Sequence, residues 1–231
     1  HENLKNFLET GYVSTTNFAV GYKSDRASYR FSGNYSKQKG QVPNSQLQTG
    51  GVKLTSSYKI SNALTLDGKL TYDKVYSPNY PRHGYGPKNH MYTFLIWMGY
   101  DVDGEDLKNH LWVPGQEGYR QANWNYAWYN NPYFAAEKLN QKYDSDIYNG
   151  QLKLRWEITK DLSIQGRTSA IKQDRFEDRA SPKSYLNYGD PRDGDYKTWN
   201  RDWLTLDNDV LATFNKQLIP AMNLTVNAGA S

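Results

Sequence analysis

The chain has 231 residues with 28 basic and 24 acidic side chains, a formal net charge of +4, and these charges are scattered rather than clustered as a nucleic-acid interface requires. It contains no cysteine, which excludes a disulfide framework and thiolate chemistry. The mean hydropathy of −0.89 argues against membrane-spanning helices, because each would need about 20 mostly apolar residues in a row.

Four segments in the first third of the chain alternate apolar and polar residues, which is the period of a β-strand. Residues 64–73 give the clearest case, with leucine, glycine and tyrosine at even positions and threonine, aspartate and lysine at odd positions. The same alternation predicts strands over about 12–23, 28–36 and 52–60. Short turns join the strands of each pair, and a longer polar loop over 37–48 separates the two pairs.

A stretch of about 70 residues without sustained alternation follows, and we predict that residues 77–145 form one long loop. Beyond it, the alternation returns. Four further strands are predicted over about 148–158, 162–172, 204–214 and 222–228. A second long polar loop, ending near Arg201, separates the third of these strands from the second.

The connections therefore alternate between short and long, which is typical of an outer-membrane barrel with short periplasmic turns and long outer loops. A strand of about 11 residues at roughly 3.3 Å each, tilted by about 45°, also spans the roughly 25 Å apolar band of such a barrel. We predict an all-β fold, an antiparallel transmembrane β-barrel portion whose apolar rows face lipid, with Tyr148 and Trp156 near the two interfaces. A soluble sandwich with one buried face is the alternative, because it produces the same alternation.

Both ends of the chain lead us to expect a larger parent protein. The first residues form neither a charged leader nor an apolar run, so no signal peptide is expected there. The eighth predicted strand is still running at Ser231. We therefore interpret residues 1–231 as one part of a longer barrel.

Short pieces along nearly the whole chain carry a family resemblance in their order and spacing. They are NFLETG at 6–11, ASYRFS at 27–32, KGQVPNS at 39–45, NHMYTFL at 89–95 and NNPYF at 130–134. With these pieces, the chain resembles the SusC/RagA-like TonB-dependent transporters of the outer membrane of Gram-negative bacteria. The resemblance implies a plugged, multi-pass barrel of about 22 strands, of which this chain supplies about eight, without the plug domain and the C-terminal strands.

The resemblance also implies a function, namely nutrient import. Oligosaccharides or peptides would cross the outer membrane with energy delivered by TonB through an N-terminal part outside these residues. A SusD-like surface lipoprotein would act as a lid on residues 77–145, on the extracellular side, and pairing of two transporter–lid units stays open. Five inward-facing cations are candidates to line the lumen or touch the plug, although solvated lumen charge is the simpler interpretation. They are Arg30, Lys53, Lys69, Arg155 and Arg167.

Aromatic residues in the long loops are the best candidates for contact with cargo or lid. Flat rings beside amide and guanidinium donors suit polar oligomers, whereas packing of the loop on itself or on the lid is the alternative that the loop's length favours. The candidates in the first loop are Trp112, Tyr119, Arg120, Trp124, Trp128, Tyr129 and Tyr133. Trp199 and Trp203 are expected on the next long loop.

Other chemistry finds little support in the residues, so we predict no enzyme and no cofactor. The acidic run at 101–106 resembles a calcium loop only superficially, because its glycine is misplaced and the distal glutamate of an EF-hand is absent. Asp190, Asp193 and Asp195 form a second acidic cluster, which we interpret in the same way. Calcium there stays a minor alternative to solvated charge. Two other classes of protein also stay open, namely a soluble carbohydrate-binding β-sandwich module with an aromatic platform and an outer-membrane adhesion or secretion component.

Overall fold

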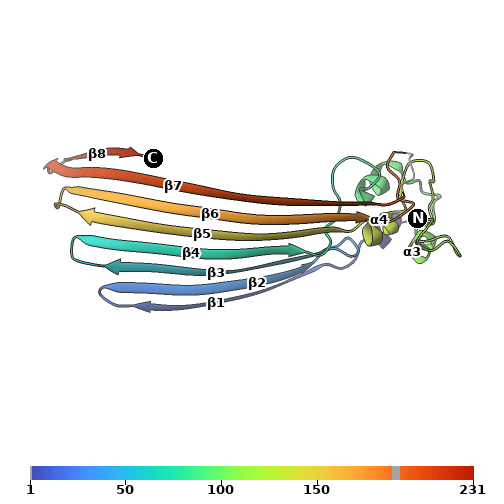
Figure 1. Ribbon diagram of the computed structural model, residues 1–231, viewed down its shortest axis with the longest axis horizontal. Helices are drawn as coiled ribbons and strands as arrows, with labels where there is room; N and C mark the ends of the chain where they lie inside the picture. The colour runs from blue at the N-terminus through green and yellow to red at the C-terminus, as the bar shows by residue number, and fades with distance from the viewer. Residues whose placement is uncertain (1, 189–192) are drawn as a thin grey trace.

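A computed structural model of the chain describes residues 2–188 and 193–231. These residues form one antiparallel sheet in which each strand pairs with its sequence neighbours, and helices and loops gather at one end of it (Figure 1). The strands are β1 (Tyr12–Lys23), β2 (Ala27–Lys39), β3 (Gln46–Lys59), β4 (Leu64–Ser77), β5 (Gln141–Glu157), β6 (Leu162–Ser181), β7 (Asp195–Ile219) and β8 (Met222–Ala230). All eight predicted strands are confirmed.

The two ends of the sheet differ as the connection lengths predict. The four short turns lie together at one end in Figure 1, and the three longer connections, residues 40–45, 78–140 and 182–194, start from the other end. We call this second end the loop end. Among the described residues, no helix has the length and apolar character needed to span a membrane.

One face of the sheet carries continuous apolar rows. The register of six strand pairs aligns the row Val20, Phe31, Leu54, Leu70, Gly150, Ala170 and Leu206. Glycine in these rows leaves space for a neighbouring ring, since a Cβ on Gly33 would lie 2.5 Å from Cε1 of Phe18. Leu70 is 60% exposed, and no second layer covers this face within the described part of the chain. The sandwich alternative, which requires a second sheet, is therefore wrong.

The opposite face is polar and is crossed by ion pairs between neighbouring strands. Nζ of Lys153 lies 3.0 Å from a carboxylate oxygen of Asp67, and Nε of Arg167 lies 2.6 Å from one of Asp209. The register places Lys153 directly beside Arg167, so the four side chains form a row across β4 to β7. The five cations predicted for the lumen, Arg30, Lys53, Lys69, Arg155 and Arg167, all lie on this face.

Three strands continue toward the loop end beyond the predicted alternation. β5 begins at Gln141 and β7 at Asp195, whereas the pattern predicts starts near 148 and 204. These extensions carry polar side chains on both faces, so the period-two signal fades although the backbone ladder with β6 continues. The expected loop location of Trp199 and Trp203 is therefore wrong, because both residues lie within β7.

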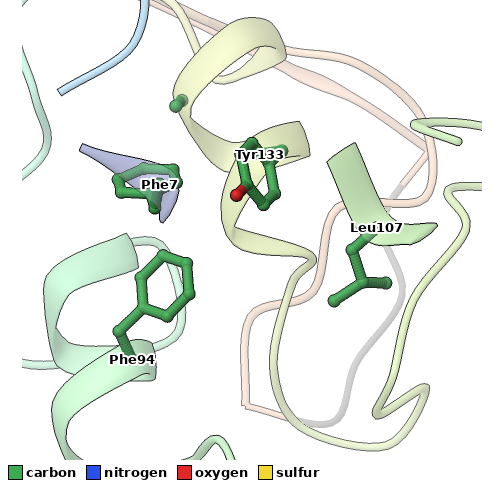
Figure 2. Packing of buried hydrophobic residues seen from close by; sticks show 5 residues of the cluster. Phe7, Phe94, Leu107 and Tyr133 are labelled. Atoms are coloured by element: carbon green, nitrogen blue, oxygen red, sulfur yellow. The ribbon is translucent and has the colours of Figure 1, made fainter. Parts of the chain in front are cut away.

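The loop end has a small core of its own. Short helices build it, namely α1 (Asn3–Phe7), α2 (His90–Tyr92), η1 (Thr93–Trp97), α3 (Gly104–Asn109) and α4 (Pro132–Lys138). The buried ring of Phe7 is central, with ring centres 4.6 Å from Phe94 and 5.0 Å from Tyr133, and Leu107 closes the cluster (Figure 2). Such a core lets a loop of this length hold a fixed shape.

Candidate functional site

A run of six aromatic rings crosses the loop end, and we call it the aromatic ladder. Its members are Tyr188, Tyr85, Tyr92, Trp97, Tyr129 and Trp124. Tyr129 stacks between two indoles, with ring centres 5.2 Å from Trp97 and 6.0 Å from Trp124 and interplanar angles of 22° and 6°. Tyr85 is 79% exposed and Trp97 is 48% exposed, so the ladder offers open ring faces. Open ring faces of this kind stack on apolar faces of sugars and on peptide side chains.

A buried asparagine holds the segments that carry the ladder. Asn130 is fully buried, and its side-chain amide donates to the carbonyl oxygens of Pro87 at 2.8 Å and Leu186 at 3.1 Å. Its Oδ1 accepts from the Leu186 N–H at 2.7 Å and from Nε2 of Gln121 at 2.9 Å. Pro87 lies two residues after Tyr85 and Leu186 two residues before Tyr188, so these bonds join the two backbone segments that carry the rings at one end of the ladder.

The neighbouring Asn131 ties the other side of the loop together. Its Oδ1 caps α4 by accepting from the N–H groups of Tyr133 at 2.9 Å and Phe134 at 3.4 Å. Its amide donates to the carbonyls of Leu107 at 2.8 Å and Ala122 at 3.0 Å. The NNPYF piece is therefore a structural crosslink, which explains why two adjacent asparagines are fully buried here.

The predicted aromatic candidates separate into packing and exposed residues. Trp124 and Tyr129 belong to the ladder. Tyr133 is only 4% exposed in the core, and Trp112 packs edge-on against Phe134 with ring centres 5.0 Å apart. Tyr133 therefore packs inside the loop core, whereas Trp112 is half-buried against Phe134.

The remaining candidates lie apart from the ladder. Tyr119 sits under the ammonium of Lys183 at 5.1 Å, and the guanidinium of Arg120 lies 4.9 Å from the ring centre of Tyr126. These four residues line a separate shallow hollow of about 480 Å³.

Trp128 is exposed in the loop, and Trp203 is exposed on the polar face of β7. Trp199, on the same face, lies 4.6 Å from the guanidinium of Arg179. The structure therefore does not bring the nine candidates into one site.

Four of the six ladder rings were not among the sequence candidates. Tyr85, Tyr92 and Trp97 precede the region that we singled out, and Tyr188 comes from a different loop. The high density of aromatic residues over 85–100 is the sequence signal that points to this segment as part of an aromatic site. The meeting of that segment with Tyr188 depends on Asn130 and has no signature in local sequence.

One aspartate from each acidic run has a structural role, namely Asp103 and Asp195. Asp103 caps α3, its carboxylate accepting from the N–H groups of Glu105 at 2.9 Å and Asp106 at 3.2 Å. In the second run, Asp195 accepts from the hydroxyl of Tyr185 at 2.7 Å, and Asp190 lies outside the described residues. Across residues 2–188 and 193–231, no three acidic or histidine side chains converge to hold a metal ion.

His90 is the most strongly perturbed titratable group of the loop end. It is 2% exposed, and its ring centre lies 5.3 Å from that of Phe7. Burial lowers the pKa of His90 from its ordinary 6.5 to about 4, because the charged imidazolium would lose its hydration in this core. The side chain is therefore neutral near pH 7 and serves packing.

Comparison with known proteins places the fold. No protein-family model and no curated protein matches the chain. Structures of the RagAB peptide importer in its closed-closed state and of the RagAB peptide transporter each align with 98% of this chain, with a TM-score of 0.67 and 15% identity. The ferric yersiniabactin uptake receptor FyuA from Yersinia pestis aligns with 90% of this chain over 26% of the receptor chain, at 11% identity. Its TM-score of 0.37 is too low to indicate a shared fold.

The alignment covers 25% of the RagAB chain, so this chain spans about a quarter of that length. The likeness extends over all eight strands and the loop end, which agrees with the barrel portion expected from the resemblance. The chain thus has the fold of a portion of a SusC/RagA-like TonB-dependent transporter β-barrel.

Proposed function

We propose that this chain is part of the barrel of a SusC-like importer in the outer membrane of a Gram-negative bacterium. In this proposal residues 1–231 supply about eight of the roughly 22 strands, and residues 77–145 form an extracellular loop whose last residues enter β5. Oligosaccharides or peptides are the cargo, TonB supplies the energy, and the chain performs no covalent chemistry and needs no cofactor. The RagAB proteins, described as a peptide importer and a peptide transporter, have the same fold over this region.

The single-layer sheet with one apolar face is the observation that carries the proposal. A soluble protein buries such a face beneath another layer, whereas lipid covers it in an outer-membrane barrel. The charged rows of the other face then line the lumen, with Arg30, Lys53, Lys69, Arg155 and Arg167 among them. The loop end, with its ordered core and open rings, faces outward, where cargo arrives.

The loop end also suits a lipoprotein lid of the SusD type. Leu95 and Ile96 of η1 are 65% and 62% exposed beside the ladder residue Trp97, and together they give an apolar edge at the rim. Apolar patches of this kind mark contact with another protein. We assign Leu95 and Ile96 to the lid and the open ladder rings to cargo.

Uptake by cells that carry the parent protein tests this proposal. The parent should fractionate with the outer membrane and migrate differently on gels before and after heating, as folded barrels do. Growth on one class of oligosaccharide or peptide should require it. A strain without the parent that takes up every such nutrient at the normal rate would refute the transport role.

Ladder variants test where cargo binds. Trp97→Ala removes an open ring, and we expect the Kd for cargo to rise about fivefold to tenfold, as follows from about 1–1.4 kcal/mol for one ring contact. The matched control is Tyr196→Ala, which removes an exposed ring from the apolar face of β7, away from the ladder. Equal Kd values for the two variants would move the cargo site away from the ladder.

A further inference from the structure

A cavity rich in cations lies at the loop end, next to the aromatic ladder. It has a volume of about 360 Å³, within the range of small-molecule sites, and it opens to solvent. Tyr85 and Tyr188 form its border with the ladder, and Gln141, Arg179 and Lys197 form its floor. The register places these three floor residues side by side on the polar face of the sheet. The cavity therefore belongs to the face that we assign to the lumen.

Positive charge dominates this cavity. Its described lining includes the cations Arg82, Lys88, Arg179 and Lys197 and the single carboxylate of Asp195. That carboxylate is already engaged, since it lies 3.8 Å from Nζ of Lys88 and accepts from Tyr185. Burial, together with the positive charge of Arg179, lowers the pKa of Arg82. The carboxylate of Glu177 lies 3.8 Å from the guanidinium of Arg179, so two carboxylates offset part of the charge of the four cations and positive charge remains in excess.

Buried donors in the cavity wall lack acceptors. Gln141 is 2% exposed, and its Nε2 has no hydrogen-bond partner among the described residues. The Nε atoms of Arg82 and Arg179 are likewise buried without a partner there. Unsatisfied buried donors cost about 1–3 kcal/mol each, so these three favour an acceptor at this site, either a ligand oxygen or a water molecule.

We propose that this cavity binds a carboxylate group of the cargo. A carboxylate has two acceptor oxygens that suit guanidinium and amide donors, and its charge offsets that of the cations. The rest of the cargo would then extend over Tyr85 and Tyr188 along the ladder. This inference rests on the proposed import function and narrows its cargo to acidic oligomers, whether the carboxylate is a peptide C-terminus, an acidic side chain or a uronic acid.

Binding to the purified parent protein in detergent tests the inference apart from transport. Two pairs of probes differ only in the carboxylate, namely a tetrapeptide with a free or an amidated C-terminus and a tetramer of galacturonic acid or of galactose. We expect the acid member of one or both pairs to bind at least 10-fold more tightly, and the pair that responds identifies the source of the carboxylate. Equal binding within both pairs would overturn the proposal.

Substitutions assign the preference to this cavity. Lys197→Gln removes an exposed cation of the cavity and should reduce the preference for the acid probe about threefold to tenfold, with Lys197→Arg restoring it. Lys160→Gln, in the short turn after β5, removes the same charge from the opposite end of the sheet and should leave the preference intact. A preference that survives Lys197→Gln and Arg179→Gln in correctly folded, heat-modifiable protein would refute the assignment. Normal uptake of every such nutrient by a strain without the parent, with the acid preference of the purified protein intact, would instead count against the transport role alone.

Discussion

Asn130→Ala tests whether one buried amide holds the aromatic ladder together. The substitution leaves three backbone groups without their partner, namely the carbonyls of Pro87 and Leu186 and the N–H of Leu186. At about 1–3 kcal/mol for each unsatisfied buried group, the gross cost is about 3–9 kcal/mol. A water molecule that enters the vacated space restores part of this, so we expect a net loss of about 3–5 kcal/mol.

The loss should be confined to the loop end. Hydrogen–deuterium exchange of the parent protein in detergent measures it, because local opening sets the protection of each segment. Amides around Pro87 and Leu186 should exchange roughly 140-fold to 3,700-fold faster, as 3–5 kcal/mol implies, and the strand amides of β5 should keep their rates. The Kd for cargo should rise as well, since Tyr85 and Tyr188 lose their fixed positions.

Asn125→Ala is the matched control. Its Oδ1 accepts only within its own turn, from the N–H groups of Ala127 at 3.1 Å and Trp128 at 2.9 Å. We expect a cost of about 1 kcal/mol at most and no change near Leu186. If Asn130→Ala increases exchange near Leu186 by less than threefold, the amide does not hold the two loops together and the reasoning is refuted.

Three further predictions concern packing, lipid and pH. Phe7→Ala should cost about 3–5 kcal/mol by emptying the centre of the loop core, seen as faster exchange in α4, and a loss below 1 kcal/mol would contradict its central role. Leu70→Arg should destabilise the barrel refolded in vesicles by about 2–4 kcal/mol in urea titrations, whereas Lys69→Arg on the other face should not; equal effects would argue against lipid contact. His90 binds fewer protons than in the unfolded chain between pH 6.5 and about 4, so the loop core should lose up to roughly 3 kcal/mol as pH falls through that window. His90→Asn should remove this pH dependence of exchange, and an unchanged dependence would show that another group is responsible.

The fold could be predicted from the sequence wherever the two faces of a strand differ in polarity. Residues 64–73 have an apolar and a polar side throughout, and the strand lies there as expected. Prediction failed for residues 195–203 of β7, because side chains on both faces are polar or amphipathic and leave no contrast to detect. Backbone pairing with β6 continues regardless of that contrast.

The aromatic site was only partly accessible from the sequence. Composition identified Trp124 and Tyr129, but it could not separate them from Tyr133, which is equally aromatic and lies in the core. Whether a ring packs or remains open depends on which distant segment covers it. Only the folded loop supplies that information.

The sequence by itself therefore determined the strands, their order and the contrast between an apolar and a polar face. These follow from local alternation and connection length, which are properties of neighbouring residues. Only the tertiary structure decided where the open rings gather and where Arg82, Gln141, Arg179 and Lys197 surround one cavity. Arg82 lies about 60 positions from Gln141 and about 100 from Arg179 in sequence. Backbone pairing and the side chain of Asn130 bring these segments together, and local sequence patterns cannot predict contacts between such distant residues.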